Sequence, residues 1–410
     1  MRERAAISIG VLCAVTACSS SDAARASSAV RDSSGITIVE NHGPYQEWQL
    51  SFPAQLRIGT VDGDSTYQFN NVQFAGRLRD GRIVVVDNGY QIRWYDPVGS
   101  YRSGVGRRGR GPGEFSVIDA ALVTPTDTLV VYDSRNRRAT WLSPGETYVR
   151  DVTLREISSG RVALLGVTSD NRLAVSVSAI SNEAIGPSTT YMNKTLTVML
   201  ASAGQLDTIA RVPGSETVVW TRFANGRLTA WLDLGLPFGH SVFAAVRSDY
   251  YALANGEGHE IQFYDWTGIK RRVARRPESA GIPLTDIDKA QYITDRMEAA
   301  RQAGRGSLEA LEQTFRDMVA AIPDGHTMPS FDQLVSDVEG RIWLRDFVSD
   351  ASDGLDVAWT VFTPDSRVER RVVTPVGLQV MHVGPEYITG VERDSLGVEY
   401  VVIYDLERRN

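Results

Sequence analysis

Short runs of apolar residues alternate with Asp- and Gly-containing turns along most of the chain. The stretch from Asp80 to Gly99 (DGRIVVVDNGYQIRWYDPVG) aligns without gaps with Asp249 to Gly268 (DYYALANGEGHEIQFYDWTG), 169 residues further on. Apolar, β-branched and aromatic runs that are bounded by such turns are typical of β-strands. The pattern therefore predicts an all-β protein in which one supersecondary unit is repeated.

Further copies of the unit follow the same order of strands and turns. The Gly81-Arg82-Ile83 start recurs at Gly340, and looser copies begin at Asp127, Asn171 and Pro385. Each copy predicts an antiparallel meander, which cannot bury both of its faces alone. Copies packed around an axis can do so, and closure of the ring protects the sheet edges. We predict one six-bladed β-propeller over residues 35–410, or seven blades if residues 178–231 contain another copy.

The apolar strand Ile36 to Val39 has no meander of its own, and the last copy stops at Asp405, close to the end of the chain. We predict that this N-terminal strand completes and closes the last blade. Such a closure would join the two ends of the chain.

A helical pattern interrupts the repeat between blades four and five, over about residues 284–322. Thr285 is a candidate start of a first helix, and Ser307 can cap a second helix with Leu308, Leu311 and Phe315 on one stripe. We expect this insertion to pack on the rim of the propeller. The alternative is a lid or a partner-binding role.

The first residues have the pattern of a secretory leader. Arg2 and Arg4 precede an apolar run from Ala5 to Ala17, which is too short to span a bilayer. Its end, Val-Thr-Ala-Cys, resembles a bacterial lipobox, which implies that residues 1–17 are removed and that Cys18 carries the lipid. An ordinary secretory leader that is cut nearby is the alternative. Residues 18–34 are rich in Ser and Ala and predict a flexible tether.

The leader therefore predicts secretion across the inner membrane and anchoring in the cell envelope, where Ser19 favours the outer membrane. The chain has 410 residues, two cysteines and a formal net charge of −7. Because Cys13 would leave with the leader and Cys18 would carry lipid, no disulfide scaffold is expected. The acidic balance excludes a generic nucleic-acid binder. We expect a monomer that is held at the membrane by its lipid.

Several motifs together resemble those of bacterial six-bladed β-propeller lipoproteins related to NHL-repeat and TolB-like proteins. They are the lipobox, GRIVVVD with YDPVG after it, the GRGPGEF connection at residues 109–115, and GRIWLRD at residues 340–346. The resemblance covers about Gly35 to Arg409 and implies the propeller fold. Such propellers include binding scaffolds, calcium-dependent lactonases and metal-dependent lyases, so the resemblance leaves the activity open.

Candidate ligand-binding residues are those expected at the mouth of the central channel, where the innermost strands begin. From the repeat alignment they are Asn71, Glu114, Arg161, His240, Asp332 and His382. Asn71, Glu114 and Asp332 could supply oxygen ligands to calcium. At most two of the five histidines are expected to meet, so a metal site built from three histidines is not expected.

A literal GxGxxG occurs at residues 104–109, but the Gly- and Pro-rich sequence after it cannot open a helix. We therefore reject a dinucleotide site. Arg107, Arg108 and Arg110 on this loop form a candidate anion site, for which a solvated connection between blades is the alternative.

The sequence thus predicts a lipid-anchored binding module for an envelope protein, a glycan or a small ligand, with no catalytic residue and no cofactor assigned. The alternative is a calcium-dependent hydrolase of the lactonase type that uses the central channel. The two hypotheses predict different channels, because the enzyme requires carboxylate and amide oxygens that converge in the channel.

Overall fold

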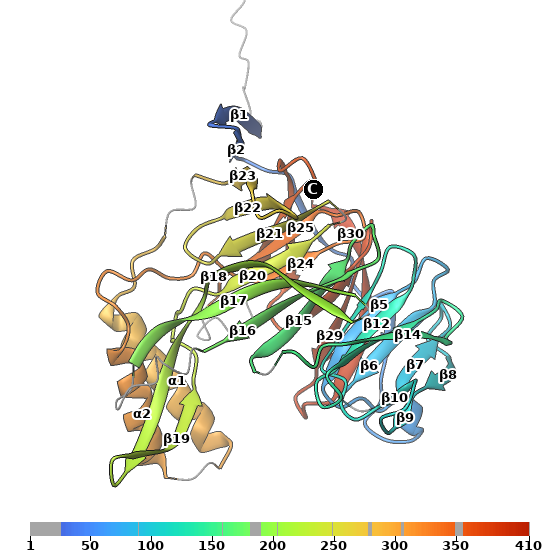
Figure 1. The fold of residues 1–410 in the computed structure, drawn as a ribbon, viewed down its shortest axis with the longest axis horizontal. Coiled ribbons are helices and arrows are strands. Elements are labelled where there is room, and N and C mark those ends of the chain that lie inside the picture. Colours follow the sequence, from blue (N-terminus) through green and yellow to red (C-terminus); the bar gives the residue numbers. More distant parts are fainter. Residues whose placement is uncertain are drawn as a thin grey trace, which may run out of the picture.

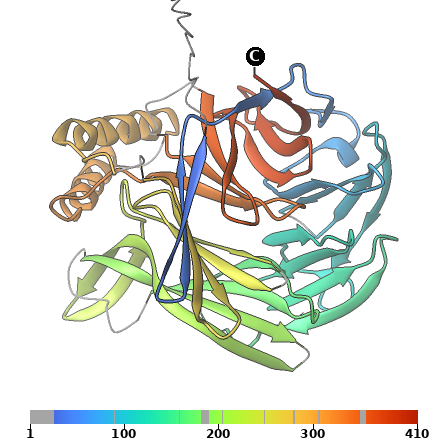
Figure 2. The same cartoon turned by 90° about the horizontal axis from the view of Figure 1, so that it is seen from above.

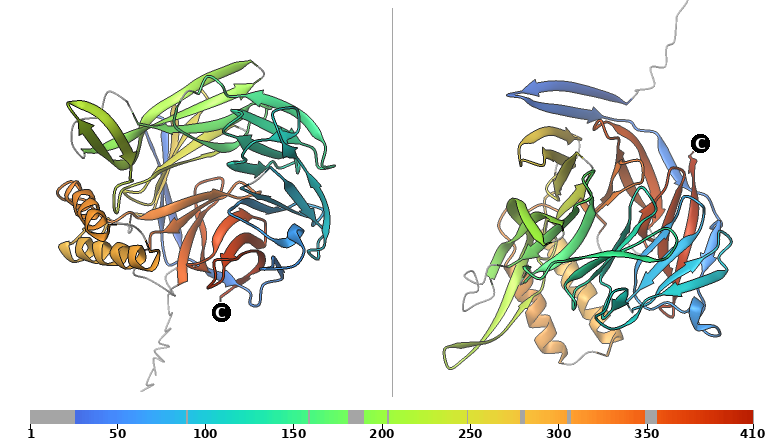
Figure 3. Two further views of the ribbon diagram at one scale, coloured as in Figure 1. Left: turned by 90° about the horizontal axis from the view of Figure 1, so that it is seen from below. Right: turned by 45° about the vertical axis from the view of Figure 1, so that its right-hand side comes forward.

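The computed structural model describes residues 26–88, 90–157, 159–180, 190–202, 204–247, 249–277, 281–304, 307–348 and 356–409, except for the side chains of residues 222–224. Within these residues the protein is predominantly β-structure. The sheets follow one another around a common axis, as in a propeller (Figure 3). The predicted leader and the predicted lipidation site Cys18 lie outside the described residues.

The first two sheets around the axis are antiparallel meanders of four strands. Their strands are β5 (Val72–Arg77), β6 (Ile83–Asp87), β7 (Ile92–Tyr95) and β8 (Tyr101–Val105), then β11 (Ala120–Val123), β12 (Leu129–Asp133), β13 (Arg138–Leu142) and β14 (Tyr148–Thr153). The Gly-rich connection between them contains two short parallel strands, β9 (Arg107–Arg108) and β10 (Glu114–Phe115).

The next sheet contains β15 (Arg161–Val167), β16 (Leu173–Ala179), β17 (Thr190–Ser202), β18 (Gln205–Ala224) and β19 (Arg227–Asp233). The described part of residues 178–231, where a hidden blade was considered, thus extends the sheet of β15. The sheet after it contains β20 (Val242–Val246), β21 (Tyr250–Asn255), β22 (Glu260–Asp265) and β23 (Lys270–Arg275).

The remaining strands form one continuous nine-stranded sheet. They are β24 (Phe331–Ser336), β25 (Ile342–Asp346), β26 (Asp356–Phe362), β27 (Val368–Pro375), β28 (Gln379–Val383), β29 (Tyr387–Arg393) and β30 (Glu399–Arg408), with β3 (Glu47–Leu50) and β4 (Leu56–Ile58) from the N-terminal region. Strand β3 joins the two halves of this sheet because it pairs in parallel with β27 and antiparallel with β30. A single 3₁₀ turn, η1 (Ser65–Tyr67), follows β4.

The N-terminal segment corrects two predictions. Strand β2 (Ile36–His42) pairs in parallel with β23 and does not close the last sheet, where β3 and β4 pair with β30 instead. Residues expected in a flexible tether form β1 (Ser27–Ser33), which pairs antiparallel with β2. Ser34 and Gly35 both have positive φ, as a two-residue type I′ hairpin turn requires. This hairpin extends the sheet of β20–β23 beyond β23 (Figure 2).

Asn41 explains why β2 lies where it does. Its side chain is fully buried, accepts a hydrogen bond from the Val368 backbone N–H at 2.9 Å and donates to the Ser366 carbonyl at 3.0 Å and the Arg275 carbonyl at 3.4 Å. The apolar pattern of β2 predicts a buried face but does not specify which sheet edge the strand joins.

The helices begin at the two predicted caps. Thr285 caps α1 (Asp286–Gln302) in a capping box with Asp288, and Ser307 caps α2 (Leu308–Ala320). Both helices lie on one side of the molecule (Figure 1). In the part of the chain that the structure describes, no helix is long and apolar enough to cross a membrane.

Large buried side chains fill the space between neighbouring sheets. Trp94 and Tyr95 are buried on β7, and Trp343 packs edge to face on Trp359, with ring centroids 6.5 Å apart. These aromatic residues recur at blade positions of the repeat and pack between neighbouring sheets. The apolar core therefore holds the sheets around the axis without a disulfide among the described residues.

Candidate functional site

The central cavity of the ring has a volume of about 330 Å³ and is lined by the first strands of the successive sheets, β5, β11, β15, β20, β24 and β28. Most of the lining is apolar. Its polar side chains are Gln73, Gln333, Ser336, Gln379 and His382. Among the described residues that line this cavity, none carries a carboxylate, and its polar groups are three amides, a hydroxyl and an imidazole.

His382 is the predicted site residue that lines the central cavity. Its side chain is buried, and neither ring nitrogen has a hydrogen-bond partner among the described residues. Burial lowers the pKa of His382 to about 4, so the imidazole is neutral at physiological pH.

The other predicted residues lie apart from the lining of that cavity. Asn71 precedes β5, its carbonyl accepts from the Asn88 backbone N–H, and Arg161 is exposed at the start of β15. Asp332 forms a two-pronged ion pair with Arg345, with contacts of 2.6 and 2.8 Å.

Glu114 belongs to the Gly-rich connection. It accepts from the Gly111 backbone N–H at 2.8 Å and pairs with Arg107, also at 2.8 Å. These bonds lower the pKa of Glu114. Its carboxylate therefore organises this loop.

Two histidines and a glutamate converge at another point of the ring. Glu216 Oε2 lies 2.9 Å from His326 Nε2 and 3.6 Å from His240 Nδ1. The imidazole rings are stacked, with centroids 4.4 Å apart. Among the described His, Cys, Asp and Glu residues, this is the one group of three whose donor atoms come together closely enough to hold a metal ion.

The carbonyl of Thr327 fixes which nitrogen of each ring carries a hydrogen. It lies 3.1 Å from His240 Nε2 and 2.7 Å from His326 Nδ1. A carbonyl oxygen only accepts, so both of these nitrogens donate to it. The nitrogens that remain, His240 Nδ1 and His326 Nε2, both face Glu216. Metal-binding histidines are typically oriented in this way by a second hydrogen bond.

The carboxylate of Glu216 is itself held by two further donors. The His240 backbone N–H donates to Oε2 at 2.7 Å, and the Tyr191 hydroxyl donates to Oε1, also at 2.7 Å. Burial alone would raise the pKa of Glu216, but its contacts with these donors and with the two imidazoles lower it. Glu216 is therefore ionised at neutral pH.

The pKa shifts of the neighbouring side chains are consistent with an ionised Glu216. Burial lowers the pKa of His240 despite the opposing attraction of Glu216. Burial and the hydrogen bond to Glu216 raise the pKa of Tyr191 to about 12, so this hydroxyl remains a donor. The lone pairs of two imidazole nitrogens thus point at an anionic oxygen. This arrangement is favourable only when a cation, either a proton or a metal ion, lies between these atoms.

The helical insertion brings His326 to this site. Met318 of α2 and Ile322 just after it are buried against Val218 of β18. Val218 and Glu216 lie on the same face of β18, because side chains two residues apart on a strand share a face. Residues 282–284 and 326–328 then pair, with the Met328 N–H donating to the Ile282 carbonyl at 2.7 Å.

A cavity of about 490 Å³ adjoins the cluster and is partly lined by Glu216, His240 and Tyr191. Glu257 and Glu260 lie on the same wall, and Tyr264 adds an aromatic face. The cluster therefore borders a space that can admit a small molecule.

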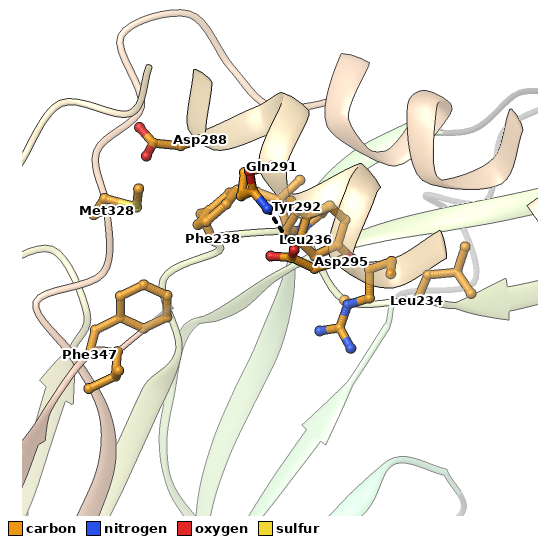
Figure 4. Close-up of a pocket in the computed structure, with 13 residues that line it drawn as sticks. Leu234, Leu236, Phe238, Asp288, Gln291, Tyr292, Asp295, Met328 and Phe347 are labelled. Carbon is orange, nitrogen blue, oxygen red and sulfur yellow. Dashed lines mark hydrogen bonds between the residues drawn. The ribbon is translucent and has the colours of Figure 1, made fainter. Parts of the chain in front are cut away.

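A smaller cavity, of about 270 Å³, lies between α1 and the connection that carries Leu236 and Phe238 (Figure 4). Tyr292 of α1 packs on Phe238, with ring centroids 5.7 Å apart. Gln291 donates to Asp295 across one turn of the helix. The contact between Tyr292 and Phe238 attaches α1 to the ring.

Sequence reasoning found one member of the convergent cluster, His240, and missed Glu216 and His326. His326 follows the helical insertion in the sequence, and its contact with Glu216 depends on how the insertion folds back. Nothing in the local sequence around Glu216 distinguishes it from other glutamates on strands.

No family model matches this chain, and no curated protein matches it. Similar solved structures include a proposed exported protein of Bacteroides fragilis (TM-score 0.45, 10% identity, 89% of this chain and 99% of the other). A member of the DUF4221 family from Bacteroides vulgatus has TM-score 0.44 and 9% identity over 89% of this chain and 100% of the other. The calcium-binding protein regucalcin of Agrobacterium tumefaciens has TM-score 0.39 and 8% identity over 89% and 97%. At these values the likeness assigns neither an activity nor a ligand.

Proposed function

We propose that this protein is a lipid-anchored, six-bladed propeller of the cell envelope that binds a small ligand through a divalent transition-metal ion held by Glu216, His240 and His326. The observation that carries the proposal is the convergence of two oriented imidazole lone pairs on one ionised carboxylate oxygen. The neighbouring cavity of about 490 Å³ favours a small ligand over a large protein or glycan surface.

The count of six blades is supported by contacts around the axis. The first strands contact one another in the order β5, β11, β15, β20, β24 and β28, and β28 contacts β5 again. Buried apolar clusters also lie between neighbouring sheets, including one that joins β5 and β6 to β29 and β30. A succession of six first strands favours six blades over seven.

The three donor groups suit zinc or a related ion. Zn²⁺ binds imidazole nitrogen and carboxylate oxygen, and sites with three protein ligands keep a fourth position open for water or a ligand. Tetrahedral ligands that lie roughly 2.0–2.2 Å from zinc are about 3.3–3.6 Å from one another. The separations of 2.9 and 3.6 Å between Glu216 Oε2 and the two nitrogens are close to this spacing.

Metal titration of the mature protein tests the site. We expect chelator-treated protein to bind one Co²⁺, with the visible absorption of a tetrahedral ion, and to release it to Zn²⁺. Glu216→Gln and His326→Gln should abolish this spectrum. Glu257→Gln is the matched control, since Glu257 lines the same cavity but is not part of the cluster.

The outcome separates a metal from a proton. If folded wild-type protein, checked by its unfolding curve, binds neither ion, the site holds only a proton and the proposal is wrong. Equal loss in Glu257→Gln would also contradict it, because the general acidity of the cavity would then be responsible.

The envelope anchor is tested separately. The leader and the Cys18 motif support it. We expect Cys18→Ala protein to leave the membrane fraction. A Cys18→Ala protein that still fractionates with membranes, after mass measurement has excluded an uncleaved leader, would contradict the anchor.

A further inference from the structure

A second cavity, on a different sheet from the proposed metal site, is lined mostly by arginine. Its volume is about 450 Å³, and it lies at the edge of the β11–β14 sheet beside the Gly-rich connection. Its charged side chains are Arg110, Arg135, Arg137, Arg138, Arg155 and Asp151. Five guanidinium groups thus face one carboxylate in a protein whose formal net charge is −7.

The floor of this cavity is fixed by Arg138. Its guanidinium group is about nine-tenths buried, donates to the carbonyls of Arg110 and Gly111 at 3.0 Å each, and lies 3.3 Å from Asp151. Asp151 also accepts from the Thr140 hydroxyl at 2.6 Å. The single carboxylate of the cavity is therefore already neutralised and hydrogen-bonded.

Asn136 ties the cavity to the Gly-rich connection. It donates to the Gly109 carbonyl at 3.1 Å and to Asp133 at 2.8 Å, and its Oδ1 accepts from the Ser116 hydroxyl. Because these bonds are internal, the walls are formed before a ligand arrives. The backbone of these walls therefore needs no ordering on binding.

The remaining four arginines have no acidic partner. Within the part of the chain that the structure describes, Arg110, Arg135, Arg137 and Arg155 form no ion pair, and all four are exposed. The Arg137 guanidinium contacts only the Arg155 carbonyl, at 3.4 Å. Like charges held around one space repel one another, and an anion with more than one negative charge would relieve that repulsion.

We propose that this cavity binds the phosphoryl group of a small phosphorylated molecule. Arginine presents a planar fork of donors that matches phosphate oxygens two at a time. Four unpaired cations favour a dianion over a single carboxylate. The volume exceeds that of one phosphate and leaves room for the organic part of the ligand.

The cavity also refines the anion loop predicted from the sequence. Arg110 of that loop lines it, whereas Arg107 pairs with Glu114 and Arg108 does not line it. Arg108 is exposed on the same loop, two residues from Arg110. It therefore provides a matched control in which one positive charge is removed nearby but outside the cavity.

Calorimetric titration of the mature protein with inorganic phosphate tests the proposal. A hydrogen bond to a charged group contributes enough that Arg110→Ala, Arg135→Ala and Arg155→Ala should each raise the Kd by about 10- to 100-fold. Arg108→Ala should change the Kd by less than about threefold. The substituted side chains have no partner to lose, and unfolding curves verify that the variants fold.

Three results would overturn the inference. Failure of phosphate to saturate wild-type protein would show that there is no such site. Equal weakening of phosphate binding in Arg108→Ala and Arg135→Ala would show that diffuse surface charge is responsible. Flotation with phosphatidylglycerol vesicles that is lost in Arg135→Ala, without binding of free phosphate, would mean that the site reads a lipid headgroup.

Discussion

The neutral, buried imidazole of His382 makes the stability of this protein depend on pH. Its ring lies against Phe74 and Tyr387, with centroids 6.2 Å away in both cases, and its two nitrogens have no hydrogen-bond partner among the described residues. Burial lowers its pKa to about 4. In the unfolded chain the same imidazole titrates near its ordinary pKa of about 6.5.

The sign and size of the effect follow from this difference. Below about pH 6.5 the unfolded chain binds a proton that the folded protein does not bind, so acid favours unfolding. The contribution of His382 is fully present above that pH and is lost as the pH falls towards 4. Each pKa unit corresponds to about 1.4 kcal/mol, which gives a loss of about 2 kcal/mol between pH 8 and pH 5.

The His382→Leu variant isolates this contribution. Urea unfolding of wild type and variant, measured across this pH range, gives the difference between their free energies of unfolding at each pH. We expect the variant to gain about 2 kcal/mol relative to wild type on going from pH 8 to pH 5. Other titrating groups cancel in this comparison. Above about pH 7.5 the difference should be constant, which serves as the internal control.

A flat difference across the whole range would refute the reasoning. It would mean that the imidazole of His382 is reached by water or by a partner in the folded protein and titrates normally. An imidazole pKa near 6.5 for His382, measured by NMR in the folded protein, would lead to the same conclusion.

Three further predictions rest on single contacts. Asn41→Ala should lower the free energy of unfolding by about 2–5 kcal/mol in urea titrations, because three backbone partners lose their bonds; a change below about 1 kcal/mol would contradict this. Tyr191→Phe should weaken Co²⁺ binding by about 10- to 100-fold without abolishing it, since Tyr191 supports the ligand Glu216 from behind; unchanged affinity would argue against that support. Gly106→Ala should destabilise the fold in thermal melts, because its φ is 101° and a Cβ would lie 2.3 Å from the Tyr90 carbonyl oxygen; an unchanged melting temperature would be inconsistent with this geometry.

The local elements could be predicted because their patterns are local. The run from Ile83 to Asp87 reads as a buried strand between turns and is strand β6. Thr285 and Ser307 predict helix starts because their side chains can accept from backbone N–H groups three residues on, as they do. Capping and alternation need no knowledge of distant parts of the chain.

The partners of the edge strands could not be predicted in the same way. Strand β2 has an apolar face, but several sheet edges could accept such a strand. Its place beside β23 depends on Asn41, whose three backbone partners lie more than 230 residues away in sequence. The Ser- and Ala-rich segment of β1 carries still less information, because its pairing uses backbone groups of β2.

The residues of the proposed metal site could not be predicted for a related reason, which also bears on the role of the insertion. Glu216 lies on a strand, His240 on a connection, and His326 comes after two helices that interrupt the repeat. The contact of 2.9 Å between Glu216 and His326 exists only because α2 packs on β18 and returns the chain to it. An insertion that only covered the rim of the propeller would not need to bring the chain back to β18. The insertion therefore contributes a ligand to the proposed site, and deleting residues 284–322 should abolish metal binding even where the ring still folds.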